Sequence, residues 1–332
     1  MPRKLDSDNQ IGRRLTLRDL HLFFTVVQHG SMAKAAAQLG ISQPSVSEVI
    51  ADLEHTLGAR LFDRRPRGVE PTMYGNALLM RTRAVFDELR QGIKDIEVLA
   101  DPASGEVRIA CAGAALATFM RPIIHRFSEA FPGVVVRITD VPSTAWEHAD
   151  LRERRHDLLL QWCSGPFAGP FLGGDLEVEI LFDDQLVVVA GAQSRWARRR
   201  KIDLAELVAE RWIFGAPDTS NYADIAETFR ARGLGMPKLG LESLSVSLRT
   251  YLLTTGQFIT AVPKSVASHL PVKILPVGLP VQKWPFGIFT LKNRTLSPVV
   301  DRFIAHLRDS MRSIALRADQ RSPRGRASTS SH

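Results

Sequence analysis

The sequence predicts a mainly α-helical N-terminal domain, one long helix, and then a larger α/β domain. Three observations predict this order. Apolar residues recur at helical spacing between residues 17 and 57. The stretch from Thr72 to Leu99 contains no proline and is predicted to form one helix. After Glu106, short apolar strands alternate with helical segments, a pattern that favours a parallel sheet.

A helix-turn-helix pattern is centred on Gly40. The first helix is predicted to end near Gly30 and is indicated by apolar residues at i, i+3, i+4 and i+7 spacing: Leu17, Leu20, Phe23, Phe24 and Val27. The short alanine-rich segment Met32–Leu39 follows, and Gly40 supplies the turn. Ser42 is a suitable N-cap for the next helix, because its side chain can accept from a free backbone N–H. The buried face of that helix would consist of Val46, Ile50, Leu53 and Leu57.

The N-terminal end of this last helix is polar and almost free of charge. Glutamine can bind adenine through two hydrogen bonds, and serine can bind several base edges or a phosphate. A helix N-terminus also favours phosphate. The pattern therefore predicts DNA contacts from the residues that point away from the buried face: Ser42, Gln43, Pro44, Ser45, Ser47 and Glu48. The alternative is an ordinary helical hairpin in which Ser and Gln are only caps.

Residues 57–72 have the pattern of a two-stranded wing. Leu61 and Phe62 would pack beneath the helices, and the basic residues would flank a groove of DNA. Phosphate contacts give affinity and salt dependence, whereas base contacts give sequence preference. We expect such contacts from Arg60, Arg64, Arg65, Arg67 and Thr72. A solvated loop is the alternative interpretation of an arginine cluster, and the neighbouring helix-turn-helix argues against it.

Residues 17–75 resemble the winged helix-turn-helix of the LysR-type transcriptional regulators. The resemblance rests on SQPSVS at the start of the recognition helix, LEHTLGARLFDR after it, and PTMYG before the long helix. It implies a mainly α winged helix-turn-helix domain with a long linker helix, followed by an α/β two-lobed effector-binding domain like the type 2 periplasmic binding proteins. The implied partners are double-stranded promoter DNA, a small-molecule effector and other copies of the chain, with RNA polymerase as a further candidate.

Composition sets limits on the class of protein. The 332 residues are enough for more than one domain, and 45% of them are hydrophobic. No apolar run is long enough for a membrane span, and the first residues lack the apolar centre of a signal peptide. Two cysteines cannot form a disulfide framework. We expect a reduced, cytoplasmic protein with no membrane partner, and the net charge of +8 gives modest support to an anionic partner.

The long helix carries an apolar stripe at spacings of 7, 4 and 7 residues, formed by Leu78, Val85, Leu89 and Ile96. This spacing is close to a coiled-coil seam and predicts pairing with a second copy. A dimer places two recognition helices on a two-fold symmetric site. Packing against the chain's own C-terminal half is the alternative. The family resemblance implies antiparallel pairing and commonly a homotetramer.

The domain limits follow from these patterns. The winged helix-turn-helix covers residues 15–72, the linker helix 73–100 and the effector-binding domain 105–312. By resemblance, lobe 1 covers about 105–181 and 283–312, and lobe 2 about 182–282. Residues 313–332 are basic and poor in apolar residues, and we expect a disordered tail.

Candidate effector contacts follow the ends of the predicted strands, because ligands of open α/β sheets bind beyond the carboxyl ends. In lobe 1 they are Ala112, Gly113, Ala114, Ala115, Ser143, Thr144, Gln161 and Trp162. In lobe 2 they are Pro217, Asp218, Thr219, Ser220, Phe258 and Ile259. Each of them could equally be a simple turn or cap residue. Family members that bind carboxylates often have Ser or Thr where this chain has Ala114. The effector is therefore less acidic, or is held chiefly by the hydroxyls of Ser143, Thr144, Thr219 and Ser220.

No enzyme active site, cofactor site or metal site is predicted. The histidines lack metal-ligand spacing, and neither a glycine-rich phosphate loop nor a nucleophile elbow is present. Cys111 and Cys163 end two strands that should be neighbours, and we interpret them as structural thiols rather than a redox pair. A ligand-responsive transcription regulator is the leading hypothesis. A constitutive DNA-binding protein whose C-terminal half only oligomerises is the alternative, and an enzyme built on the α/β half is the third.

Overall fold

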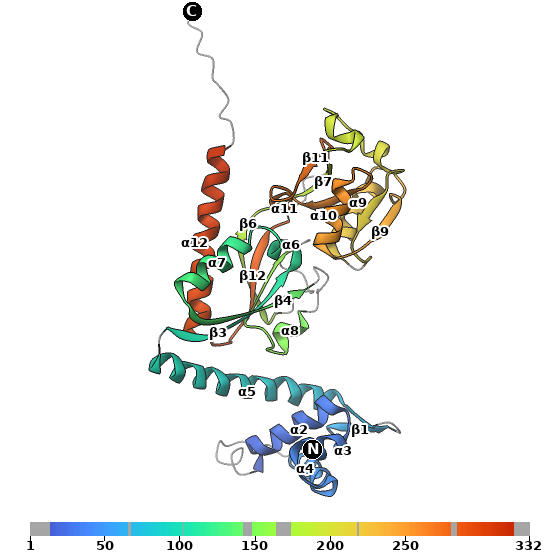
Figure 1. Cartoon of the computed structure of the whole chain (residues 1–332). Helices are drawn as coiled ribbons and strands as arrows, with labels where there is room; N and C mark the ends of the chain where they lie inside the picture. Colours follow the sequence, from blue (N-terminus) through green and yellow to red (C-terminus); the bar gives the residue numbers. More distant parts are fainter. Residues whose placement is uncertain are drawn as a thin grey trace, which may run out of the picture. The chain divides into compact units, whose positions relative to one another are not determined.

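The computed structural model describes residues 14–65, 68–101, 103–141, 148–163, 174–217, 219–279 and 284–321 (Figure 1). The chain divides after Gly92 into two compact units, which are considered separately below. Within the described residues, no helix combines the length and the apolar character that crossing a membrane requires.

The N-terminal unit is the predicted winged helix-turn-helix. It consists of α2 (Leu17–His29), α3 (Met32–Leu39), α4 (Gln43–Leu57), β1 (Phe62–Arg65) and β2 (Gly68–Pro71). Each helix begins at a polar cap, and Ser42 accepts a hydrogen bond from the backbone N–H of Ser45. The helices end at Gly30, Gly40 and Gly58, which all adopt the left-handed conformation that glycine tolerates best. Local sequence signals thus define all three helices.

The wing is fastened to the helices by backbone groups. β1 and β2 pair antiparallel, and the N–H of Val69 donates to the carbonyl of Gly30 at 2.9 Å. Gly68 has a φ of +142°, and a Cβ there would overlap the carbonyl oxygen of Gly30. On the other side, the Glu54 carboxylate accepts from the N–H groups of Leu61 at 2.7 Å and Phe62 at 3.2 Å. These contacts fix where the wing lies relative to α4.

Helix α5 spans Met73–Ala100, as its lack of proline predicts. The hydroxyl of Thr72 accepts from the N–H of Gly75 at 3.1 Å and so caps the first turn. Leu78 packs against the core of the N-terminal unit. Beyond that turn, α5 carries large apolar side chains that are exposed: Val85, Leu89, Ile93, Ile96 and Leu99.

The second unit contains two five-stranded sheets. The first has the strand order β4-β3-β5-β12-β6. Its strands are β3 (Ser104–Ala112), β4 (Gly133–Val141), β5 (Leu158–Trp162), β6 (Leu176–Phe182) and β12 (Phe286–Leu291). β3 is parallel to β4 and β5, whereas β12 is antiparallel to both its neighbours, so the sheet is mixed rather than purely parallel. Its helices are α6 (Gly113–Leu116), α7 (Arg121–Ala130), α8 (Ala149–Arg152) and α12 (Pro298–Arg321).

The last helix is longer than predicted. The sequence predicts a tail without structure from residue 313, but α12 continues to Arg321. The extension contains Ala, Leu, Arg and Gln, which are good helix formers. Low apolar content alone therefore does not define where this helix ends.

A buried cluster of charges lies within the first lobe. The Asp157 carboxylate accepts from Arg108 Nη2 at 2.7 Å and from Arg294 Nη2 at 2.9 Å. The side chains of Asp157 and Arg294 are 1% and 0% exposed. Burial alone would raise the pKa of Asp157, but the hydrogen bonds and charges of the two arginines outweigh it and hold the pKa below its usual value.

The second sheet has the order β11-β7-β10-β8-β9. Its strands are β7 (Leu186–Gly191), β8 (Trp212–Phe214), β9 (Leu239–Glu242), β10 (Ile259–Pro263) and β11 (Val272–Ile274). Its helices are α9 (Ser220–Ala231), α10 (Val246–Thr254) and α11 (Lys264–Ala267), with two 3₁₀ turns at Arg195–Arg198 and Leu204–Leu207. Trp212 is fully buried and stacks on Phe214, which anchors the side of the sheet that α9 covers.

The two lobes are joined by two crossings of the chain. One runs from β6 to β7, and the other returns to β12. Asp184, in the first crossing, accepts from the indole N–H of Trp162 at 3.0 Å and from the Ser265 hydroxyl at 2.5 Å. These bonds connect the end of β5 in the first lobe with α11 in the second. One apolar cluster also includes side chains from both lobes, so the lobes share part of their core.

Candidate nucleic-acid interface and effector site

The N-terminal end of α4 presents a small polar surface. Gln43, Pro44, Ser45 and Glu48 are exposed, and Ser42 lies beside them as the cap. The hydroxyls of Ser42 and Ser45 are 2.9 Å apart and hydrogen-bond to each other. Gln43 has no side-chain hydrogen bond with the other described residues, so its amide is available to a partner.

Ser47 departs from the predicted orientation. It is half-buried, and its hydroxyl contacts Met32 Sδ on α3 at 3.4 Å. The reason is geometric, because Ser47 stands three residues before the buried Ile50 and therefore lies at the edge of the packed face. Its hydroxyl lines a groove rather than the exposed end of α4.

That groove lies between α4 and the wing and has a volume of about 710 Å³. Arg60, Arg64 and Arg65 line it, together with Asp63 and Glu54. Arg65 pairs with Glu70 at 2.9 Å, an exposed ion pair of small energetic weight. Arg60 and Arg64 are exposed and have no ionic partner among the described residues. Among the described residues of the wing, these two guanidinium groups remain available to phosphates.

Thr72 and Arg67 are the other two residues expected to contact DNA at the wing. The Thr72 hydroxyl donates to the carbonyl of Arg60 at 2.7 Å while it caps α5. It therefore closes the base of the wing. Arg67 lies outside the described residues.

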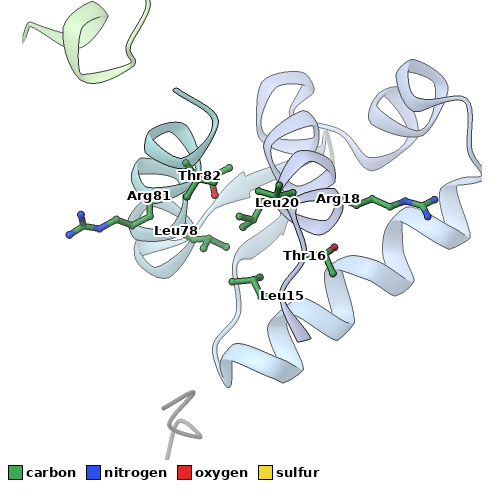
Figure 2. Close-up of a pocket in the computed structure, with 9 residues that line it drawn as sticks. Leu15, Thr16, Arg18, Leu20, Leu78, Arg81 and Thr82 are labelled. Carbon is green, nitrogen blue, oxygen red and sulfur yellow. The ribbon is translucent and has the colours of Figure 1, made fainter. Parts of the chain in front are cut away.

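A second groove, of about 600 Å³, lies between the start of α2 and helix α5. Figure 2 shows Leu15, Leu20 and Leu78 between the two helices, while Arg18 and Arg81 extend away from them. Thr82 is fully buried, and its hydroxyl has no hydrogen-bond partner among the described residues. The groove is thus mainly apolar and continues toward Val85 and the exposed apolar side chains of α5.

In the first lobe, a carboxylate lies against the turn after β3. A Cβ on Gly113 would be 2.5 and 2.6 Å from the carboxylate oxygens of Asp140, the next-to-last residue of β4. Ala112 and Ala115 are buried, and Ala114 is partly buried and packs against the same core. The predicted effector turn therefore has a carboxylate beside it, which the sequence analysis did not identify.

The remaining expected contacts of the first lobe are dispersed. Trp162 packs into the core that the lobes share and gives its N–H to Asp184. Gln161 is buried, its Nε2 is 3.5 Å from His148 Nδ1, and its Oε1 has no partner among the described residues. Burial, together with the charge of Arg152, lowers the pKa of His148 to about 4 against the opposing effect of Asp175. Ser143 and Thr144 lie outside the described residues.

In the second lobe, most of the expected residues have structural contacts. The Thr219 hydroxyl donates to the Ala216 carbonyl at 2.7 Å and caps α9. Ile259 is buried. The guanidinium carbon of Arg211 lies over the ring of Phe258, 4.3 Å from the ring centre. Pro217 is exposed in the turn after β8. Asp218 and the side chain of Ser220 lie outside the described part of the chain.

One cation of the second lobe was not predicted. Arg249, on α10, donates through Nη2 to the Thr260 hydroxyl of β10 at 2.9 Å. A single arginine on a helix normally indicates a solvated face, so spacing could not reveal it. Only the burial of its guanidinium, which lowers the pKa of Arg249 to about 10, distinguishes it.

The cysteines are free thiols near the ends of two strands that are neighbours, as predicted: Cys111 is the next-to-last residue of β3, and Cys163 directly follows β5. Cys111 packs in the core on one side of the first sheet, and Cys163 packs against the cluster on the other side. Burial and then the charge of Asp140 raise the pKa of Cys111 far above its usual value, and burial raises that of Cys163 to about 12. Both positions therefore disfavour the reactive thiolate. No group of three possible metal-ligating His, Cys, Asp or Glu side chains occurs among the residues described.

Comparison with family models gives two matches. The model described as a bacterial regulatory helix-turn-helix protein of the lysR family matches residues 17–76. The model described as the LysR substrate binding domain matches residues 100–312.

Individual relatives match most of the chain. The HTH-type transcriptional regulator GbpR of Azospirillum brasilense is 27% identical over 313 residues, which cover 92% of this chain and 90% of that protein. The regulator TdcA of Escherichia coli K12 is 28% identical over 249 residues, or 75% of this chain and 77% of that protein. Among solved structures, full-length CbnR in complex with its target DNA has a TM-score of 0.59 and 22% identity over 89% of this chain and 100% of its own. A variant of full-length OxyR from Pseudomonas aeruginosa has a TM-score of 0.59 and 21% identity over 90% of this chain and 95% of its own.

Proposed function

The chain belongs to the LysR family of transcription regulators, and from this we propose that it binds promoter DNA through the exposed end of α4 and changes that binding when its α/β domain holds a small molecule. Membership makes it a DNA-binding regulator with an effector-binding domain. The residues that perform each task are our proposal. Because such a regulator acts where the genome lies, we place it in the cytoplasm.

The observation that supports the DNA contacts most directly is the exposed tip of α4. Gln43 is exposed and uncommitted, and it stands next to the small side chains of Ser42 and Ser45. A surface of this kind can approach base edges in the major groove. Arg60 and Arg64 flank it from the wing without ionic partners among the described residues, which suits phosphate binding. We therefore assign sequence preference to Gln43 and general affinity to the two arginines.

A gel-shift series on the operator separates these two roles. Gln43→Ala should cost roughly 1–3 kcal/mol on the operator and much less on unrelated DNA, because a bidentate base contact is lost. Arg64→Ala should weaken binding to both, and should reduce the slope of log affinity against log salt by about 0.9. Gln28→Ala, which removes an exposed glutamine from the far end of α2, is the matched control. If both variants bind as the wild type does at every salt concentration, the assignment is wrong.

We assign the exposed apolar face of α5 to a second copy of the chain. Val85, Leu89 and Ile96 follow one another at spacings of 4 and 7 residues, and exposed Ile93 lies one turn from two of them. The groove in Figure 2 continues this apolar surface at the N-terminal unit. A symmetric dimer would cover it and provide two copies of α4 for two half-sites.

Sedimentation tests the dimer. The pair Leu89→Asp and Ile96→Asp should shift the protein toward monomer and abolish high-affinity operator binding, while Asn76→Asp, at an exposed position of the same helix, should do neither. Unchanged sedimentation of the double variant would mean that another surface holds the oligomer together.

We assign the effector to the carboxyl ends of the two sheets, where β3, β4, β8 and β10 end and where ligands of open α/β sheets bind. An effector acts only if it binds two arrangements of the protein with different affinity. DNA footprints with and without extracts of small metabolites test this role. A footprint that no physiological metabolite changes would favour the constitutive alternative. We propose no catalytic step.

A further inference from the structure

The second lobe contains a guanidinium whose environment is that of a ligand anchor. Arg249 lies in the first half of α10 and reaches down to β10, the central strand of its sheet. The only hydrogen bond of its side chain within the described part of the chain goes to the Thr260 hydroxyl, 2.9 Å away. That hydroxyl in turn donates to the carbonyl of Ile213 at 2.6 Å, so it is a neutral partner already fixed in place. The remaining guanidinium donors are unused.

The contrast with Arg294 shows why this is unusual. Arg294 is buried in the first lobe and is held by the carboxylate of Asp157 at 2.9 Å and the carbonyl of His156 at 2.7 Å. No carboxylate pairs with Arg249 among the described residues, although burial is strong enough to lower its pKa to about 10. It therefore stays a cation at neutral pH. Arg249 as a whole is half-buried, and its guanidinium is partly withdrawn from water. A cation in such a position without a counter-ion is costly, and a bound anion would reduce that cost.

Arg249 also lies on the side of the second sheet that adjoins the first lobe. Along β10 the side chains alternate, with Ala261 in the cluster beneath α9 and Val262 in the cluster that both lobes share. Thr260 is on the same face as Val262, and α10 contributes Leu253 to that shared cluster. The guanidinium is thus on the face of the second lobe that takes part in the contact between lobes.

The same end of the sheet holds a further unsatisfied polar group. Asn221, on α9, donates to the Ala261 carbonyl at 2.9 Å, next along β10 from Thr260. Its Oδ1 is buried and has no partner in the described structure. Buried polar atoms without partners are rare, and a polar ligand or ordered water commonly satisfies them.

The first lobe carries an exposed carboxylate, Asp140, near the carboxyl end of β4. The Asp140 carboxylate lies against the Gly113 turn, with no hydrogen-bond or ionic partner among the described residues, and its charge adds to the high pKa of Cys111. Ala114 supplies no hydroxyl there. A ligand carboxylate would be repelled at this turn, whereas a hydroxyl or ammonium group could donate to Asp140.

We propose that the effector is a small organic acid whose carboxylate binds Arg249 in the second lobe and whose hydroxyl or ammonium group faces Asp140 in the first. This rests on the proposed function, in which the effector lies between the two lobes. A molecule that spans both groups would favour one arrangement of the lobes over others, and so would supply the difference in affinity that regulation requires.

The test uses four three-carbon probes on the full-length protein: glycerate, serine, propionate and glycerol. Glycerate and serine combine a carboxylate with a donor group, propionate has only the carboxylate, and glycerol has only hydroxyls. At fixed ionic strength, glycerate or serine should raise the thermal midpoint of the wild type more than propionate or glycerol. The better of the two identifies the donor as hydroxyl or ammonium.

Two variants locate the contacts. Arg249→Met should weaken the carboxylate response roughly 10- to 100-fold, the effect of losing a charged hydrogen bond. Asp140→Asn should leave propionate unchanged and remove the advantage of the donor-bearing acids. Arg211→Met, which removes a cation of the same lobe that lies over Phe258, is the control and should change nothing.

Stability without ligand gives an independent readout. If Arg249 is a ligand anchor, Arg249→Met should leave the midpoint of the free protein unchanged or raised, because it removes a buried unpaired charge. A large fall in that midpoint, an equal response of wild type and Arg249→Met, or no response to any carboxylate would overturn the proposal. An effector-dependent footprint that Arg249→Met leaves intact would reject only this inference and not the regulator function.

Discussion

Replacing Asp157 by asparagine should lower the free energy of unfolding of the α/β domain more than the replacement of any exposed charged residue. The carboxylate accepts hydrogen bonds from the backbone N–H of Arg108 and from three guanidinium nitrogens: Arg108 Nε at 3.4 Å, Arg108 Nη2 at 2.7 Å and Arg294 Nη2 at 2.9 Å. Asparagine has nearly the same shape but replaces one acceptor by an N–H donor. That donor would face arginine donors, and Arg294, whose side chain is 0% exposed, would lose its counter-ion.

The expected loss is about 3–5 kcal/mol, the usual cost of breaking a buried ion pair from one side. Because the folded-state pKa of Asp157 is lowered, its contribution is fully present above the unfolded pKa of about 3.9. The contribution disappears as the pH falls through the folded pKa. The difference between wild type and variant should therefore be constant from neutral pH down to about pH 5 and should shrink only below the unfolded value.

Tryptophan fluorescence reports on the correct domain, because all five tryptophans lie between residues 146 and 284. In urea, with a slope of roughly 3 kcal/mol per molar, the midpoint should fall by about 1–1.7 M. Asp175→Asn is the matched control, since Asp175 pairs with Arg152 at 2.8 Å but is 48% exposed, and it should cost less than about 1 kcal/mol. Equal midpoints for Asp157→Asn and the control would refute the view that burial makes this pair important.

Three further changes test other parts of the fold. Gly68→Ala should destabilise the folded wing by about 1–3 kcal/mol, because alanine is strained at a φ of +142° and its Cβ would overlap the Gly30 carbonyl oxygen. Faster protease cleavage within the wing and weaker operator binding would reveal this loss. Protease resistance equal to that of the wild type would contradict it. Asp184→Asn should lower the thermal midpoint of the α/β domain and red-shift its fluorescence, since Trp162 loses a charged acceptor at 3.0 Å; an unchanged spectrum would show that this bond contributes little. Cys163, with a pKa of about 12, should resist iodoacetamide at pH 8 in the folded protein and react once urea unfolds it; rapid labelling of the native protein would exclude a structural role.

Local signals made the N-terminal unit predictable. Ser42 caps α4, and the three glycines that end the helices adopt the conformation that their positions indicate. The attachment of the wing was not predictable in the same way. It depends on Glu54, whose carboxylate binds backbone N–H groups seven and eight residues later, and no periodic pattern records such a contact. The orientation of Ser47 was wrong because it stands at the edge of a helical face, where a small rotation changes its surroundings.

In the α/β domain, too, local patterns predict the elements but not the contacts between residues distant in sequence. The alternation of strands and helices predicts the sheets, but the antiparallel β12 depends on a return of the chain that alternation does not reveal. The sequence predicted which residues follow the strands. It did not predict whether their polar groups are available to a ligand, since Thr219 and Trp162 hydrogen-bond to partners within the fold. Arg249 and Asp140 emerge only once three-dimensional packing shows which charges lack a partner among the described residues.

The order of strands also has a consequence for how the chain folds during synthesis. The first lobe contains β12 and α12, so its core needs Phe286, Phe303 and Leu307, which are made after the whole second lobe. The N-terminal unit, whose contacts lie within residues close in sequence, can fold as soon as it leaves the ribosome. A ribosome that stops after β11 would therefore release a DNA-binding unit attached to an open sheet with exposed apolar surface, a species prone to aggregation. The α/β domain can therefore complete its fold only after the segment from β12 to the end of α12 has been synthesised. Until then, a folded DNA-binding unit is attached to an unfinished effector-binding domain.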